Sequence, residues 1–157
     1  MQKITPFLWF DDQAEAAANF YVSVFQNSKV KDTARYTGEE PLGKKGAVMT
    51  VSFELNGQEF VALNGGPRFQ FTEAVSFVIN CETQEEIDYY WAKLTADGGE
   101  EVQCGWLTDK YGLSWQVVPA KIAEWAGDAA GFDRVMRAVL PMKKLDLAAL
   151  QAAFDGK

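Results

Sequence analysis

The first part of the chain follows one order of apolar and polar patterns that indicates a strand, a helix and three further strands. Residues 47–55 alternate, with Met49, Val51, Phe53 and Leu55 on one side, which is typical of a half-buried strand. Asn56-Gly57 then predicts a two-residue hairpin turn. The expected elements are a strand at 4–10, a helix at 13–25 and strands at 30–36, 47–55 and 60–63.

The first helix has its own start and face signals. Asp11-Asp12 precedes it and is expected to begin it, because short acidic side chains favour the residues that open a helix. Ala16, Phe20 and Val24 recur at helical spacing and are expected to fall on one face of the helix.

After Asn64-Gly65-Gly66-Pro67 the same order of elements begins again. Thr83-Gln84-Glu85-Glu86 has the residues of a helix start, and Asp97-Gly98-Gly99 those of a helix end. The second series is a strand at 74–80, a helix at 83–96 and strands at 100–106 and 113–118. The sequence therefore predicts a duplicated β-α-β-β-β module, of which the second copy is shorter.

Residues 120–157 form an Ala-rich helical tail. Phe132, Val135, Met136 and Val139 have helical spacing before Pro141, and Asp146 is expected to cap a last helix that carries Leu147, Leu150 and Phe154. Their apolar stripes either pack on the outer face of the same sheet or cover a second subunit. We therefore expect one α+β domain over 1–157, with module one at 1–68, module two at 69–119 and the tail at 120–157.

Composition excludes several function classes. The chain of 157 residues has no histidine, so catalytic triads that need imidazole and His-based zinc or iron sites are absent. A net charge of −7 without basic runs argues against nucleic-acid binding, and the chain has no apolar run long enough for a membrane span. Cys81 and Cys104 are expected to be free thiols of a cytoplasmic protein without a signal peptide, although one disulfide is an alternative.

Three strings carry a family resemblance. They are Thr5-Pro6-Phe7-Leu8-Trp9-Phe10, the run from Gly105 to Gln116 (GWLTDKYGLSWQ), and in the tail Arg134-Val135-Met136 with Leu140 to Asp146 (LPMKKLD). Together with the tandem modules, they resemble the PhnB-like group of the vicinal-oxygen-chelate superfamily, which includes glyoxalase I, bleomycin-resistance proteins and extradiol dioxygenases. The resemblance covers nearly the whole chain.

This resemblance implies a cupped, eight-stranded mixed sheet, usually in a homodimer, with a pocket inside each cup. Many members of the group carry the label of a 3-demethylubiquinone 3-methyltransferase. No two glycines stand at G-x-G spacing, so the glycine-rich turn of the usual S-adenosylmethionine fold is missing. A methyltransferase on another scaffold stays an alternative.

Metal enzymes of the superfamily bind their ion with residues of the first and last strand of each module. Carried over by position, these sites fall on Thr5, Val61, Ser76 and Gln116. Only Gln116 is a plausible ligand, and a divalent ion needs several anionic or imidazole donors. We therefore expect no metal and no cofactor. Glu59 could restore a ligand only if its strand slipped in register.

If the two modules align in this way, one concave face gathers a small-molecule site. The expected ligand-binding residues are Gln116, Thr5, Ser76, Phe7, Trp9, Val78, Asn80 and Trp106. An apolar pocket with a few polar groups suits a small organic ligand, although the aromatic side chains could also fill the face themselves. Gln116 would orient the ligand, or its amide would be satisfied by neighbouring groups.

The function expected from these residues is metal-independent binding of a small, partly aromatic or hydrophobic molecule, as in the resistance and sequestration branch. The alternatives are a lyase, isomerase or dioxygenase, the labelled methyltransferase, or an assembly role of the tail helices. Arg68 either closes over an anionic ligand or is an exposed linker residue. The acidic pairs, such as Asp11-Asp12 and Glu85-Glu86, are expected to be caps or solvated faces.

Overall fold

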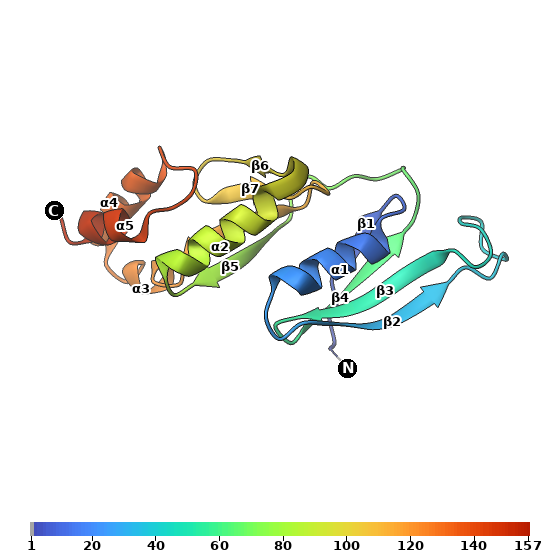
Figure 1. Cartoon of the computed structure of the whole chain (residues 1–157). Helices are drawn as coiled ribbons and strands as arrows, with labels where there is room; N and C mark the ends of the chain where they lie inside the picture. The colour runs from blue at the N-terminus through green and yellow to red at the C-terminus, as the bar shows by residue number, and fades with distance from the viewer. Residues whose placement is uncertain (1) are drawn as a thin grey trace. The chain divides into compact units, whose positions relative to one another are not determined.

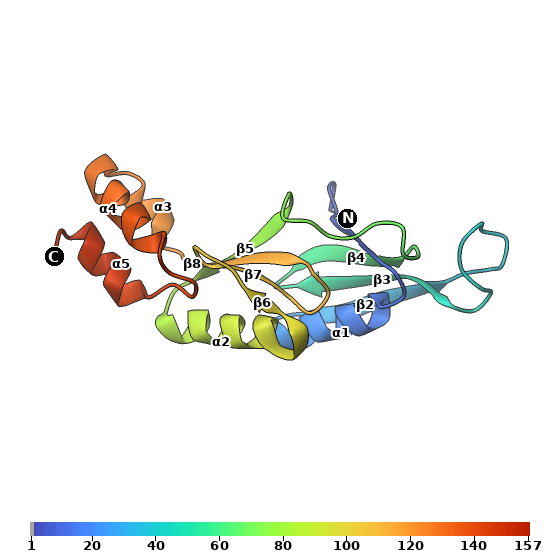
Figure 2. The ribbon, with the colours of Figure 1, turned by 90° about the horizontal axis from the view of Figure 1, so that it is seen from above.

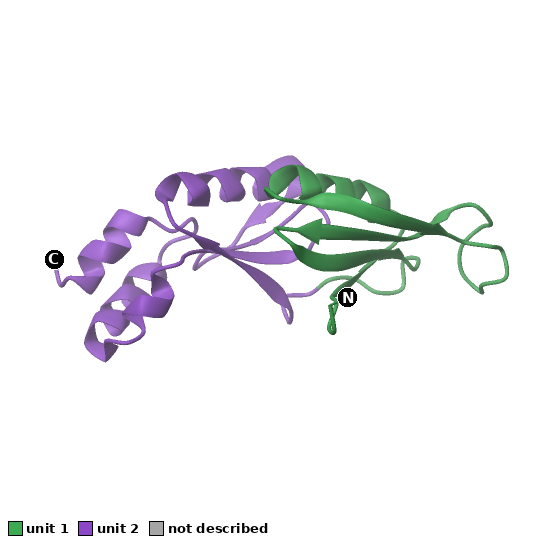
Figure 3. Ribbon diagram, turned by 90° about the horizontal axis from the view of Figure 1, so that it is seen from below, with its two compact units in different colours: residues 1–71 green, residues 72–157 purple. Residues whose placement is uncertain are grey.

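The structure, a computed structural model, describes residues 2–157 and divides the chain after Phe71 into two compact units (Figures 1 and 3). Unit 1 contains β1 (Phe7–Phe10), α1 (Ala14–Val24), β2 (Lys29–Arg35), β3 (Val48–Leu55) and β4 (Gln58–Asn64). Its sheet has the order β1-β4-β3-β2, in which β1 is parallel to β4 and the other pairs are antiparallel. Figure 2 shows α1 lying along one face of this sheet.

Unit 2 repeats this order. It contains β5 (Ser76–Cys81), α2 (Gln84–Thr95), the short 3-10 helix η1 (Ala96–Gly98), β6 (Glu100–Glu101), β7 (Trp106–Thr108) and β8 (Ser114–Pro119). The order β5-β8-β7-β6, with β5 parallel to β8, is the order of unit 1. The tail adds α3 (Ile122–Trp125), α4 (Ala129–Val139) and α5 (Leu147–Phe154). The predicted α+β class, the two βαβββ modules and the helical extension are confirmed, with the eight strands in two four-stranded mixed sheets.

The core of unit 1 lies between α1 and its sheet. Val51, Phe53 and Leu55 are buried, as their alternation predicts, and the rings of Tyr21 and Phe53 stack with centroids 6.2 Å apart. Of the three residues predicted to share one face of α1, Val24 is buried, Phe20 is partly buried and Ala16 is exposed. The buried residues of the helix are Ala14, Ala17, Ala18, Tyr21 and Val24, and the small alanines let it lie close to the sheet.

The start of α1 also differs from the prediction. Gln13 is the N-cap and gives no side-chain hydrogen bond, and neither Asp11 nor Asp12 replaces it. Instead, Oδ1 of Asn64, at the end of β4, accepts a hydrogen bond of 2.8 Å from the backbone N–H of Ala14. A residue 50 positions away thus caps the helix, which a local sequence motif cannot reveal.

The strand expected at 100–106 is two short strands, β6 and β7, and this prediction is corrected. Cys104 and Gly105 between them have φ angles of 63° and 81°, which reverse the chain direction. Glycine is a common signal for such a turn, but cysteine is not, so the run of β-prone residues concealed it.

The apolar side chains of the tail pack chiefly on one another within unit 2, and Met136 of the predicted stripe is 39% exposed. Trp125, Val135, Val139, Leu145 and Leu150 form one apolar cluster, against which Val118 of β8 packs. Asp146 caps α5 as predicted, since its Oδ1 accepts a hydrogen bond of 3.0 Å from Ala149 N–H. Among residues 2–157, no helix has both the length and the apolar character needed to cross a bilayer.

Candidate functional site

Each four-stranded sheet has one face against its helix and a second face that carries the predicted site residues. On β1, Leu8 and Phe10 are buried, whereas Phe7 on the opposite face is 61% exposed. On β5, Ile79 and Cys81 are buried, whereas Val78 is 49% exposed. Successive side chains of a strand alternate between the faces, so Phe7 and Trp9 share one face of the unit 1 sheet, and Ser76, Val78 and Asn80 share one face of the unit 2 sheet.

On the sheet of unit 2, the structure brings Gln116 together with three other predicted residues. Gln116 of β8 lies opposite Val78 of β5 on one side and opposite Trp106 of β7 on the other. Its Nε2 donates a hydrogen bond of 2.9 Å to Oγ of Ser76. Asn80 is exposed near the end of β5, opposite Val118. The result is a neutral polar pair between an aliphatic and an indole side chain.

On the sheet of unit 1, Phe7 and Trp9 lie opposite Val61 and Leu63 of β4. Thr5 precedes β1 and is partly buried. The pair Phe7–Val61 has the same place in its module as the pair Val78–Gln116, because both join the first strand to the last in a parallel register. The predicted residues therefore form two groups, one on the sheet of each unit.

Thr5, Val61, Ser76 and Gln116 are the four positions carried over as metal sites. Their side chains do not suit a divalent ion. Val61 has no donor atom, Thr5 and Ser76 have neutral hydroxyls, and the amide of Gln116 is already bonded to Ser76. A divalent ion needs about four to six donors, several of them anionic or imidazole. Within residues 2–157, no group of three or more His, Cys, Asp or Glu side chains is placed to hold a metal ion.

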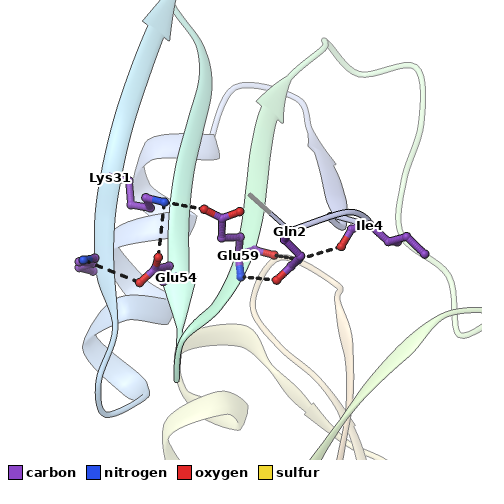
Figure 4. A network of polar contacts seen from close by, with 6 residues as sticks. Gln2, Ile4, Lys31, Glu54 and Glu59 are labelled. Carbon is purple, nitrogen blue, oxygen red and sulfur yellow. Dashed lines mark hydrogen bonds and ion pairs between the residues drawn. The ribbon is translucent and has the colours of Figure 1, made fainter.

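Glu59, two residues before Val61, belongs to a polar network along the edge of this face (Figure 4). Its carboxylate pairs with Lys31, whose ammonium also lies 3.4 Å from Glu54, and Gln2 bonds to the Glu59 backbone. The hydrogen bond that Lys31 donates to the Glu59 carboxylate lowers the pKa of Glu59 and raises the pKa of Lys31. The Glu59 carboxylate is thus already engaged in an ion pair with Lys31.

Asp109 is a structurally important residue that the sequence analysis included only within the run from Gly105 to Gln116. It is 2% exposed, its Oδ1 accepts hydrogen bonds from the N–H groups of Tyr111 and Leu113, and its Oδ2 accepts one of 2.9 Å from Trp115 Nε1. These bonds fix the β7–β8 turn directly before Gln116. The signal that could have found it is an Asp three residues before the turn glycine Gly112 and six before a strand tryptophan.

The hydroxyl of Ser114 and the thiol of Cys81 are two further buried groups on β8 and β5 of unit 2. The Oγ of Ser114, opposite Ser76 in the register, is buried without a hydrogen-bond partner among the residues that the structure describes. Burial raises the pKa of the Cys81 thiol to about 12, with Glu86 and Glu82 adding to the effect. Cys81 is therefore protonated at neutral pH, and both cysteines are free thiols, which agrees with the sequence analysis.

Two cavities are lined by other residues. One of about 370 Å³ in unit 1 is bounded by Asp11, Asp12, Glu15 and the ring of Tyr36. The other, of about 580 Å³, lies between α2 and the start of α5, beside Gln84, Lys121 and Lys144. Arg68 is exposed, and its guanidinium carbon lies 5.3 Å from the centroid of the Phe69 ring.

The comparisons with known proteins agree with the fold. The model of a family described as 3-demethylubiquinone-9 3-methyltransferase matches residues 2–118. A solved structure of a PhnB protein from Bacillus cereus is 43% identical, with a TM-score of 0.68, and covers 76% of this chain and 100% of its own. No curated protein matches the chain.

Two more distant structures are similar in fold alone. Protein PA1353 from Pseudomonas aeruginosa is 17% identical with a TM-score of 0.60 and covers 74% of this chain and 96% of its own. The fosfomycin resistance protein FosX from Listeria monocytogenes is 15% identical with a TM-score of 0.53 and covers 78% of this chain and 94% of its own. The match to the family model ends at residue 118, before the tail helices.

Proposed function

The chain belongs to the family described as 3-demethylubiquinone-9 3-methyltransferase, and we propose that this member is a metal-independent small-molecule-binding protein of the vicinal-oxygen-chelate superfamily. The fold likeness to a fosfomycin resistance protein supports the superfamily, and the chemistry of the site supports the binding role. The observation that carries the proposal is the Gln116–Ser76 hydrogen bond between Val78 and Trp106.

The Gln116–Ser76 pair leaves donors on both side chains and an acceptor for a ligand. Ser76 Oγ accepts from the amide, so its own O–H proton is available to donate, and Oε1 of Gln116 is available to accept. Apolar side chains on both sides favour an organic molecule with a complementary polar group. We assign a ligand-binding role also to Thr5, Phe7 and Trp9 of unit 1 and to Asn80 and Trp106 of unit 2, and we propose that the protein is a homodimer.

A thermal-shift screen of the purified protein, with and without a chelator, tests this function. The panel contains divalent metals, S-adenosylmethionine and small aromatic compounds, because a compound that binds only the folded state raises the melting temperature. We expect a shift with an organic compound that the chelator does not change and that Gln116→Leu removes. Gln58→Leu, at an exposed position of β4, makes the same side-chain change and is the control.

Two results would contradict the proposal. A metal-dependent shift that the chelator abolishes would show a metal enzyme with ligands other than those compared here. Saturable binding of S-adenosylmethionine with methyl transfer to a quinol precursor would establish the activity in the family's description.

A further inference from the structure

Trp9 is fixed in one orientation by three groups of its own unit. Its Nε1 donates a hydrogen bond of 2.9 Å to the Gly66 carbonyl, and the Phe69 ring meets the indole edge-on with centroids 4.9 Å apart. A Cβ atom at Gly65 would lie 2.3 Å from Cζ2 of the indole, so only glycine permits this contact. The loop after β4 therefore holds the indole in place, and binding against it would cost little side-chain entropy.

Aromatic surface around this indole is accessible. Phe69 is 54% exposed, and Phe7, two residues before Trp9 on the same strand face, is 61% exposed. Single exposed apolar residues are normal, but a fixed indole with two exposed phenylalanines of the same unit offers an extended surface for stacking.

A cation stands beside these rings. The Arg68 guanidinium carbon is 5.3 Å from the centroid of the Phe69 ring, and within residues 2–157 Arg68 has no ion pair. The chain as a whole has a net charge of −7, so this guanidinium is a positive charge on a predominantly acidic chain. Guanidinium groups recognise carboxylates through parallel N–H donors and also stack on aromatic rings.

We infer that Trp9, Phe69 and Arg68 form a subsite for a planar aromatic anion, with the ring stacked on the aromatic side chains and the anionic group at Arg68. This inference rests on the proposed function and defines its ligand class as aromatic carboxylates and related planar anions. The occupant is a small molecule because the fixed indole supplies a ring-sized surface and the guanidinium supplies a single complementary charge.

The test measures binding of three probes with the same ring and different charge to the full chain by calorimetry. They are 2-naphthoate, 2-naphthamide and 2-(aminomethyl)naphthalene. We expect 2-naphthoate to bind most tightly and Arg68→Gln to lower its affinity about fivefold, the size of an exposed ion pair, while the amide is unaffected. Phe69→Ala, at an exposed loop position, should weaken the naphthoate and the amide together.

Lys93→Gln is the matched control. Lys93 also lies over an aromatic ring, with its Nζ 5.9 Å from the Tyr89 ring centroid, but it belongs to α2 of unit 2. The substitution removes the same charge, so a general electrostatic effect would appear in both variants. We expect Lys93→Gln to bind 2-naphthoate as the wild type does.

Several results would overturn the inference. They are no binding of 2-naphthoate, equal binding of all three probes, or the same loss in Lys93→Gln as in Arg68→Gln.

A second copy of the chain is the other possible occupant of this surface. Sedimentation that shows Phe69→Ala breaking a dimer, without competition from 2-naphthoate, would assign the surface to that copy. If Gln116→Leu abolishes binding while Arg68→Gln and Phe69→Ala do not, the inference alone fails; if a chelator abolishes binding, the proposed function fails.

Discussion

At the scale of single residues, Asn64 connects three elements of unit 1. Its Oδ1 accepts a hydrogen bond from Ala14 N–H, its Nδ2 donates one of 3.1 Å to the Val48 carbonyl, and its own carbonyl accepts one from the Tyr36 hydroxyl. The side chain thus replaces a missing cap and ties β3 to β4. It has no charge and no role in the site, so composition gave no reason to select it.

We predict that Asn64→Ala lowers the free energy of unfolding by about 2 kcal/mol. The variant loses a helix cap and leaves the Val48 carbonyl without this donor, and each effect is worth about 1 kcal/mol. Urea denaturation measures the change. Asn19→Ala, at an exposed position of α1, should stay within about 0.5 kcal/mol of the wild type, and an equal loss in both variants would contradict the capping role.

The thiol of Cys81 gives a second prediction at this scale. Because burial raises its pKa to about 12, the thiol stays protonated at pH 8.5 and is also inaccessible. In a Cys104→Ser background, we expect iodoacetamide to leave the native protein unlabelled and to label it fully in urea, as mass spectrometry would show. Rapid labelling of the native protein would contradict a buried, protonated Cys81 thiol.

The sign of the pH effect follows from the same pKa. The folded state keeps the Cys81 proton up to about pH 12, whereas the unfolded chain releases it near 9. The thiol therefore contributes stability that is complete below pH 9 and is lost as the pH rises towards 12. We expect Cys81→Ala to lose stability less steeply than the wild type between pH 9 and 11, measured by urea denaturation at each pH.

At the scale of elements, the reversal between β6 and β7 depends on backbone conformation. Gly105 has a φ of 81°, and a Cβ there would lie 3.0 Å from both Leu145 Cδ1 and the Val117 carbonyl. Gly112 has a similar φ of 85°, but no atom within 4 Å of its Cβ position. The two glycines therefore separate backbone strain from steric contact.

We predict that Gly112→Ala costs about 1 kcal/mol of stability and that Gly105→Ala costs about 2 kcal/mol or more. Both substitutions place an alanine in the left-handed region, and the second adds the contacts with Leu145 and Val117. Thermal and urea denaturation compare the two variants directly. An equal cost would mean that the tail segment moves aside without loss.

At the scale of the whole molecule, the tail is joined to α2 by one glutamine. Gln84 Nε2 donates a hydrogen bond of 3.1 Å to the Leu145 carbonyl, and its Oε1 accepts one of 2.7 Å from Leu147 N–H. Lys144 also pairs with Asp88 at 2.9 Å, and this contact helps to lower the pKa of Asp88, after the hydrogen bond from Gln84. These polar contacts fix the tail to α2, in addition to the packing of its apolar cluster.

We predict that Gln84→Leu loosens this attachment and costs about 1–3 kcal/mol, because two backbone groups lose their partners. Limited proteolysis should then cut the segment 140–147 faster than in the wild type. Gln13→Leu, at the exposed start of α1, is the control, and equal cleavage rates in all three proteins would contradict the role of Gln84.

The acid side of the stability profile also belongs to this scale. The pKa values of Glu59, Asp88 and Glu40 are all lowered, so these carboxylates stabilise the fold above their unfolded pKa and lose this effect as the pH falls through their folded pKa. We expect stability to fall below about pH 4.5 and Glu59→Gln to reduce that slope. Glu85→Gln removes a charge from the exposed first turn of α2 and is the control; an identical reduction there would contradict the role of the Lys31 network.

The periodic patterns of the sequence determined the elements and their order. Alternation at 48–55, the Asn56-Gly57 turn and the helix start at Thr83 depend on residues close together in the chain, so they could be predicted without the fold. The repeat of the modules matched Val78 to Phe7 and Gln116 to Val61, because each pair has the same place in the order of elements. The lack of histidine likewise limited the possible chemistry, because it is a property of composition and does not depend on how the chain folds.

Only the tertiary structure decided the contacts between distant residues. The Asn64 cap of α1, the Gln116–Ser76 bond and the fixing of Trp9 by Gly65 and Phe69 all join residues that lie far apart in the chain, so local sequence patterns do not reveal them. The face of α1 that is buried depends on what packs against it, and so does the environment of Arg68. Local propensity selects a helix or strand, but the register and packing of the sheets select the partners of each side chain.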